Sequence, residues 1–169
     1  ALVIESYGLG LSAPLDADLV NAAIDAGASD RELQDLTEDM SKARWATVPE
    51  LTLEFQEAWE ASGVTCTFQN AGEEGNDPLR LMKRLARHTY VTDAMPDFMM
   101  RVPTPGTIEA AHRAGKRCTY LTGNGIPLSG DQTNPSEELR YIGLFAQMGV
   151  RMMHLTYNRR NPIGDGCGE

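Results

Sequence analysis

The segment Gly149–Glu169, GVRMMHLTYNRRNPIGDGCGE, changes abruptly from an apolar run to a polar, glycine-rich loop. The apolar part predicts a buried parallel strand. Its apolar and aromatic positions are Val150, Met152, Met153, Leu155 and Tyr157. Residues 158–168 contain two Asn, two Arg, one Pro and three Gly, which favours an ordered turn over a helix. Ligands of α/β folds usually bind where strands give way to loops, so Tyr157, Asn158 and Asp165 are candidate substrate-binding residues.

Three other short runs also predict strands, at residues 2–7, 64–69 and 117–122. Capping patterns between them predict helices. The predicted caps are Asp16, Ser29 with Glu32, Thr47 with Glu50, Asp77 and Asn134, and a further helix is predicted over residues 104–114. Strands that alternate with helices indicate a parallel sheet with right-handed crossovers. The fold class is therefore α/β, and we expect residues 1–169 to form a single domain.

The predicted apolar stripes show which side of two of these helices should face the sheet. After Asp77 the stripe is Leu79, Met82, Leu85 and Ala86. The solvated face of the same helix is Lys83, Arg84, Arg87 and His88, for which a basic binding patch is the less favoured alternative. After Asn134 the stripe is Leu139, Ile142, Leu144 and Phe145. His154 lies within the last predicted strand, where a hydrogen-bonded core residue is expected.

Composition excludes several classes of partner. A net charge of −9 argues against a surface for nucleic acid, because phosphate binding depends on clustered Lys and Arg. No apolar run approaches the roughly 18 to 20 residues that span a bilayer. The three Cys residues suggest no disulfide framework, and Cys66 and Cys118 are expected to be buried free thiols in a reducing, cytoplasmic setting.

The loop after the first strand contains Gly8-x-Gly10-x-x-Ala13, which imitates a dinucleotide-binding fingerprint. Pro14 interrupts the position where the fingerprint's helix should already be running. A flexible loop at the rim of a barrel is therefore the favoured interpretation.

The last predicted strand and its loop resemble the fourth-strand segment of the membrane (renal) dipeptidase family. The resemblance rests on Gly149-Val150-Arg151, Leu155-Thr156, Asn158 and the run from Asn161-Pro162 to Asp165. The family reads GxRxxxLTHxxxN here, and Tyr157 stands where the family has its substrate-contacting His. The resemblance implies a TIM-like (β/α) barrel of which this chain supplies about the first four β/α units. The rest of the barrel would come from a continuing or separate chain. A small open sheet is the alternative.

The resemblance also implies where a two-metal site would lie. The family's first strand ends in Asp-x-His-x-Asp, and here the stretch is Glu5-Ser6-Tyr7-Gly8-Leu9, so Tyr7 and Leu9 replace metal ligands. Asn124 stands where the family has its metal-bridging Glu, and a neutral amide cannot supply that charge. We therefore expect no metal ligands from this chain, and zinc only if the rest of the barrel supplies them.

Tyr7, Asn124 and Tyr157 can each donate a hydrogen bond to an oxyanion, and they are the candidate catalytic residues. The candidate substrate-binding residues are Glu5, Asn158 and Asp165. The alternative for the two tyrosines is simple packing at the rim with their hydroxyls in water.

Three functions fit this reading. The first is a dipeptidase-like hydrolase with a lost or altered two-metal site, the second is a metal-independent enzyme acting on a small polar carbonyl compound, and the third is a catalytically silent binding protein. The expected partners are a small-molecule or dipeptide-like substrate, the remainder of the barrel, and a second copy of the chain in a homodimer.

Overall fold

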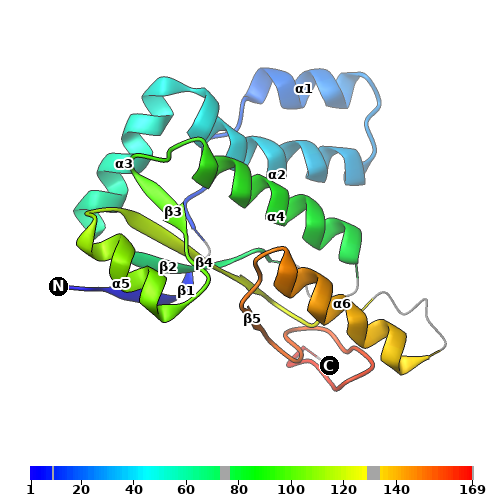
Figure 1. Ribbon diagram of the computed structural model, residues 1–169. Helices are drawn as coiled ribbons and strands as arrows, with labels where there is room; N and C mark the ends of the chain where they lie inside the picture. The colour runs from blue at the N-terminus through cyan, green and yellow to red at the C-terminus, as the bar shows by residue number, and fades with distance from the viewer. Residues whose placement is uncertain (9, 73–76, 129–133, 169) are drawn as a thin grey trace.

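A computed structural model describes residues 1–8, 10–72, 77–128 and 134–168 as strands and helices in alternation (Figure 1). The strands are β1 (Ile4–Gly8), β2 (Cys66–Asn70), β3 (Met99–Arg101), β4 (Arg117–Gly123) and β5 (Met152–Met153). The helices are α1 (Ala17–Asp25), α2 (Asp30–Thr47), α3 (Pro49–Ser62), α4 (Pro78–Asp93), α5 (Pro105–Arg113) and α6 (Pro135–Gln147). The alternation predicted from the sequence is confirmed.

All strand pairs in the sheet are parallel, and the order is β1-β2-β4-β3 with β5 also paired to β4. β3 pairs with the first part of β4 and β5 with its last two residues, on the side of β4 away from β2. The sequence analysis did not predict β3, because a strand of three residues is too short to give a periodic signal. The sheet is curled, as in part of a TIM-like barrel.

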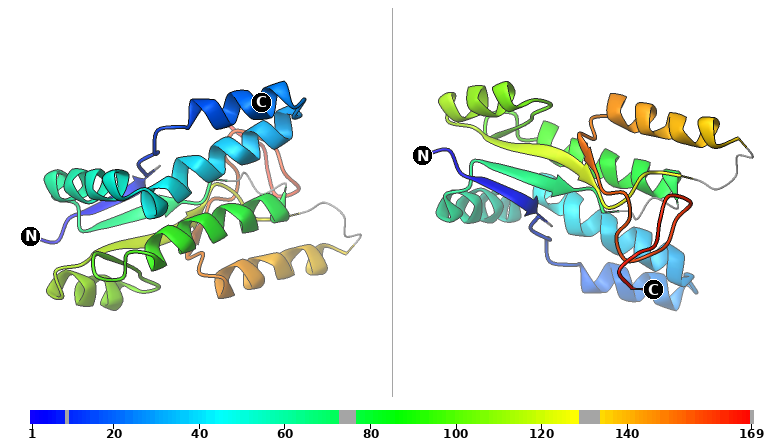
Figure 2. Two further views of the ribbon diagram at one scale, coloured as in Figure 1. Left: turned by 90° about the horizontal axis from the view of Figure 1, so that it is seen from above. Right: turned by 90° about the horizontal axis from the view of Figure 1, so that it is seen from below.

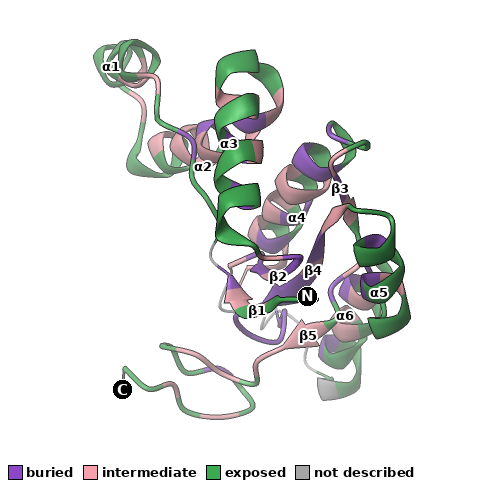
Figure 3. Ribbon diagram, turned by 90° about the vertical axis from the view of Figure 1, so that its left-hand side faces the viewer, coloured by how far each residue is buried: buried purple, intermediate pink, exposed green. Residues whose placement is uncertain are grey.

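The insertion of β3 puts α5 on the opposite face of the sheet from α2 and α4 (Figure 3). α4 leads from β2 past β4 to β3, whereas α5 leads back from β3 to β4. Two right-handed crossovers that run in opposite directions across a sheet lie on its opposite faces. Ile108 and Ala111 of α5 pack with Cys66 and Cys118, which are register partners on β2 and β4. Both thiols are buried and free, as predicted.

β1 is exposed along part of its length and β5 is less buried than predicted, because each is paired with one neighbouring strand in the described sheet. Leu2, Val3 and Ile4 are exposed at the edge beyond β2. β5 contains only Met152 and Met153 instead of the predicted run to residue 157, since β4 ends at Gly123 and offers no further partner. Leu155 is accordingly 63% exposed.

The helix caps were predicted well, with one exception. Asp16, Ser29 with Glu32, Asp77 and Asn134 all accept hydrogen bonds from the first turn of their helices. Thr104, where a helix was predicted to begin, caps α5 in the same way. The predicted cap of Thr47 with Glu50 is wrong, because α2 continues through Thr47 and Val48 stands between α2 and α3. α1 starts at Ala17, so the glycine loop after β1 does not open directly into a helix as a dinucleotide site requires.

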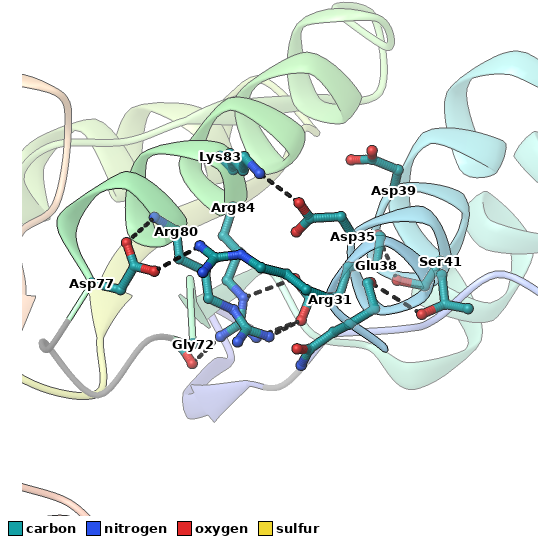
Figure 4. Close-up of polar contacts among 12 residues, drawn as sticks. Arg31, Asp35, Glu38, Asp39, Ser41, Gly72, Asp77, Arg80, Lys83 and Arg84 are labelled. Carbon is teal, nitrogen blue, oxygen red and sulfur yellow. Dashed lines mark hydrogen bonds and ion pairs between the residues drawn. The ribbon is translucent and has the colours of Figure 1, made fainter. Parts of the chain in front are cut away.

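The predicted helix faces need correction. The buried apolar residues of α4 are Leu81, Leu85 and Val91, whereas Leu79, Met82 and Ala86 are exposed. α4 is rotated because residues predicted to be solvated form ion pairs with α2. Lys83 pairs with Asp35 and Arg84 with Glu38 (Figure 4). Arg87 pairs with Glu38 and Asp39. The apolar stripe of α6 is also narrower than predicted, since Phe145 is buried but Leu139 and Leu144 are exposed. α1 buries none of its residues.

In the part of the chain that the structure describes, no helix is both long and apolar enough to cross a bilayer.

Candidate functional site

Side chains from three strands meet at the carboxyl edge of the sheet. The Tyr7 hydroxyl, at the end of β1, donates a hydrogen bond of 2.9 Å to Oδ1 of Asn124, which directly follows β4. The Asn70 amide, at the end of β2, donates to the same Oδ1 at 2.5 Å and to the Tyr7 hydroxyl at 3.3 Å. The two Asn residues are 5% and 9% exposed. We call Tyr7, Asn70 and Asn124 the edge triad.

A β-bulge in β1 aims Tyr7 into the edge triad. Glu5 pairs with Thr67 and Gly8 with Gln69, so three steps along β1 match two along β2. A Cβ at Gly8 would lie 1.9 Å from Cγ2 of Thr67 and 2.6 Å from Oε2 of Glu5, so only glycine fits this backbone path. The Tyr7 amide donates to Oε1 of Glu5 at 2.9 Å, which holds the bulge from within.

Two further rings close the site from the segment after β5, which folds back beside the carboxyl ends of the strands (Figure 2). The His154 ring stacks on Tyr7 with ring centroids 5.7 Å apart, and Tyr157 lies 6.3 Å from Tyr7. His154 and Tyr157 are themselves 6.2 Å apart. The prediction that His154 is a core residue is therefore wrong, because it is half-buried and contacts the site.

Tyr7 is held in its neutral form. Burial and then the neighbouring Tyr157 hydroxyl raise the pKa of Tyr7 to about 12, although the hydrogen bond that it accepts from Asn70 and the one that it donates to Asn124 act in the opposite direction. A phenol with this pKa is protonated at physiological pH. Tyr7 is therefore a hydrogen-bond donor rather than a base.

The structure brings three of the six predicted site residues together, namely Tyr7, Asn124 and Tyr157. Glu5 supports the backbone of Tyr7 through one carboxylate oxygen, and its Oε2 is buried without a hydrogen-bond partner among the described residues. Asn158 accepts from Sγ of Cys167 at 3.3 Å. Asp165 pairs with Arg160 at 2.7 Å on an exposed part of the terminal loop, so the structure does not place it among the edge triad.

Sequence reasoning missed Asn70 and His154. Asn70 carried a usable signal, because it ends a predicted strand at the same edge as Tyr7 and Asn124. His154 carried no such signal, because its position beside Tyr7 depends on β5 ending at Met153, the residue before it.

The donor set does not fit the two-metal site that the family resemblance implies. In the described ranges no group of three or more His, Cys, Asp or Glu side chains is arranged so that it could hold a metal ion. The groups that do meet are a neutral phenol and two amides, which lack the negative charge that holds two divalent cations. Leu9, at the position of another family ligand, lies outside the described residues. No step through a metal follows from these side chains.

Comparisons with known proteins support the fold. No protein-family model matches the chain, and no curated protein matches its sequence. Among solved structures, an amidohydrolase from Pseudomonas aeruginosa is similar, with a TM-score of 0.59 and 20% identity over 69% of this chain and 34% of the other. The chain thus spans about a third of the length of that structure.

At this identity the likeness shows the fold alone: a mixed α/β architecture with a curled parallel sheet, consistent with part of a TIM-like barrel. The resemblance to the membrane dipeptidases stays a hypothesis.

Proposed function

We propose that this chain forms part of the active site of a hydrolase-like α/β-barrel enzyme that acts on a small amide or dipeptide-like compound without the two-metal chemistry of the dipeptidases. The observation that carries the proposal is the edge triad, which places hydrogen-bond donors at the edge where α/β barrels bind substrate. The similarity to an amidohydrolase structure agrees with it.

The edge triad would polarise a carbonyl group through Asn124. Its Oδ1 already accepts from Tyr7 and Asn70, which fixes the orientation of the amide group. Within the described residues Nδ2 of Asn124 makes no hydrogen bond, so it can donate to a substrate oxygen. A donor fixed in this way stabilises the oxyanion that develops during hydrolysis, which is the largest single contribution in many acyl-transfer enzymes.

His154 is the residue best placed to move protons. In the proposed step His154 takes a proton from water while the water oxygen attacks the carbonyl carbon. The imidazolium then returns the proton to the leaving amine as the C–N bond breaks. Tyr157, whose ring lies 6.2 Å from that of His154, would donate a hydrogen bond to the same substrate. His154 thus supplies the general base that the sequence analysis did not identify.

A catalytically silent binding protein is the second candidate function. It is favoured by one observation: the three polar groups of the edge triad bond to one another, as they would in a rigid binding surface. Donor placement without an effective base would give binding but no turnover.

The test uses the intact natural protein after dialysis against a chelator, with a panel of dipeptides and N-acyl amino acids and product detection by chromatography. We expect turnover that survives chelation and that Asn124→Leu and Tyr157→Phe each reduce by about 10²-fold. Tyr90→Phe, on the exposed face of α4, is the matched control. Turnover restored only by added zinc would overturn the metal-free proposal. Binding with no turnover by any compound would support the binding protein.

A further inference from the structure

A cavity of about 240 Å³ lies behind the edge triad, between α2, α4 and the ends of β2 and β4. Lys42 of α2 lines it together with Arg87 and His88 of α4, and Asn70 and Asn124 form its wall toward the edge triad. The volume is below the range of roughly 300–1,000 Å³ typical of pockets for drug-sized ligands. It suits a group of a few heavy atoms.

The positively charged side chains around this cavity differ in whether a carboxylate pairs with them. Arg87 is paired, since its guanidinium lies 2.9 Å from Glu38 and also contacts Asp39. Lys42 differs: within the described ranges its ammonium has one hydrogen bond, 2.9 Å to the carbonyl of Leu11, and no carboxylate at ion-pair distance. An ammonium carries three donors, so two remain for another acceptor.

The pKa shifts of two residues that line the cavity agree with this uneven pairing of charge. Burial lowers the pKa of Lys42, which means that its charge is poorly compensated where it lies. Burial, followed by the charges of Lys42, Arg84 and Arg87, lowers the pKa of His88 to about 3. His88 is therefore neutral and adds no charge of its own, but its ring nitrogens can donate or accept a hydrogen bond.

Glu38 is the acidic residue of the cavity wall, and it does not neutralise Lys42. Its carboxylate is engaged by Arg80 at 2.6 Å and Arg84 at 2.7 Å, on the α4 side of the interface (Figure 4). An anion that entered the cavity would meet the ammonium of Lys42 rather than a competing carboxylate.

We propose that this cavity binds a small carboxylate with Lys42 as its counter-ion, and that the carboxylate belongs to the substrate of the edge triad. The first half stands on the cavity and its charges, and the second half rests on the proposed function. Asn70 and Asn124 border both sites, so a short molecule whose carboxylate lies beside Lys42 would have its amide within reach of Asn124. The substrate class is then a small amide that carries a free carboxylate.

The test compares N-acetylglycine with its neutral counterpart N-acetylglycinamide by calorimetric titration of the intact protein. We expect the acid to bind at least about 10-fold more tightly than the amide, because a partly buried ion pair is lost with the charge. Lys42→Met should abolish this preference and Lys42→Arg should restore part of it. Lys83→Met is the matched control, since Lys83 pairs with Asp35 at the outer side of the same helices. Equal binding of acid and amide by the unaltered protein would overturn the proposal even if Lys42→Met does not fold.

Two further outcomes separate this inference from the proposed function. A preference for the acid that depends on Lys42, with no turnover of any amide, would leave the anion cavity standing and remove the hydrolase. Turnover of uncharged amides that Lys42→Met leaves unchanged would keep the hydrolase and overturn the cavity. Inorganic phosphate, titrated in parallel, identifies the anion: tighter binding of phosphate than of N-acetylglycine would also overturn the assignment to a carboxylate.

Discussion

The hydroxyl of Tyr7 and Oδ1 of Asn124 are 2.9 Å apart, although 117 positions separate the two residues in the chain. They belong to the ends of β1 and β4, which are not neighbours, because β2 lies between them. Asn70 of β2 bonds to both and completes the edge triad. The hydrogen bonds therefore couple three strands at the edge where the backbone ladder stops.

Tyr7→Phe tests the contribution of this coupling to stability. The substitution removes the hydroxyl that donates to Asn124 and accepts from Asn70, so we expect the free energy of unfolding to fall by about 1–2 kcal/mol. Urea unfolding followed by circular dichroism measures it. Tyr90→Phe, which removes an exposed hydroxyl on α4, should change stability by less than about 0.5 kcal/mol. Equal losses in the two variants would show that the edge triad adds no stability.

Gly8→Ala tests the bulge. The new Cβ would overlap Cγ2 of Thr67, so β1 must shift, and we expect a loss of about 1–3 kcal/mol in urea unfolding. Thr67→Ser removes the overlapping methyl group, and the double variant should recover part of the loss. Gly143→Ala in α6 meets no atom within 4 Å and should stabilise by roughly 0.5–1 kcal/mol. A Gly8→Ala protein as stable as the unaltered one would refute this account of the bulge.

Glu38 makes the contact between α2 and α4 sensitive to acid. Burial opposes ionisation of its carboxyl group, but Arg84 and Arg80 outweigh burial and lower its pKa from 4.5 to about 2. A carboxyl group whose folded-state pKa is depressed contributes stability above its unfolded pKa and loses it as pH falls from about 4.5 toward 2.

Unfolding of the unaltered protein and Glu38→Gln at a series of pH values isolates this contribution. The stability advantage of the unaltered protein should shrink by about 1–2 kcal/mol between pH 6 and pH 3, which allows for solvent screening. Two curves that stay parallel over this interval would mean that the Glu38 ion pairs contribute nothing that depends on ionisation.

His88 gives a second pH dependence, at higher pH. Burial and then the nearby cations lower its pKa from 6.5 to about 3, so below pH 6.5 the unfolded chain takes up a proton that the folded protein does not. Stability should therefore fall as pH drops from 6.5, by up to about 1.4 kcal/mol per pH unit from this group. His88→Gln should remove this slope, and the His88 ring resonances of the folded protein should stay constant between pH 7 and pH 5. Titration of the ring within that range would contradict the prediction.

Local patterns in the sequence predicted most helices and strands, but they predicted poorly which side of a helix is buried. Helix caps such as Asp16 and Asn134 were predictable because an N-cap is decided by a side chain and the backbone two or three residues away. The rotation of α4 was not predictable, because it follows from ion pairs between residues that lie more than 40 positions apart, such as Arg84 and Glu38.

The same distinction between local and long-range relations applies to the candidate site. The sequence by itself determined the alternation of strands and helices and most of the helix caps, because each depends on neighbours along the chain, and it named Tyr7, Asn124 and Tyr157 as candidate site residues. Only the tertiary structure decided that Asn70 and His154 join them and that Lys42 borders a cavity without a carboxylate partner among the described residues. Those relations depend on strand order, on a bulge and on where β5 ends, and these are set by packing between segments distant in sequence.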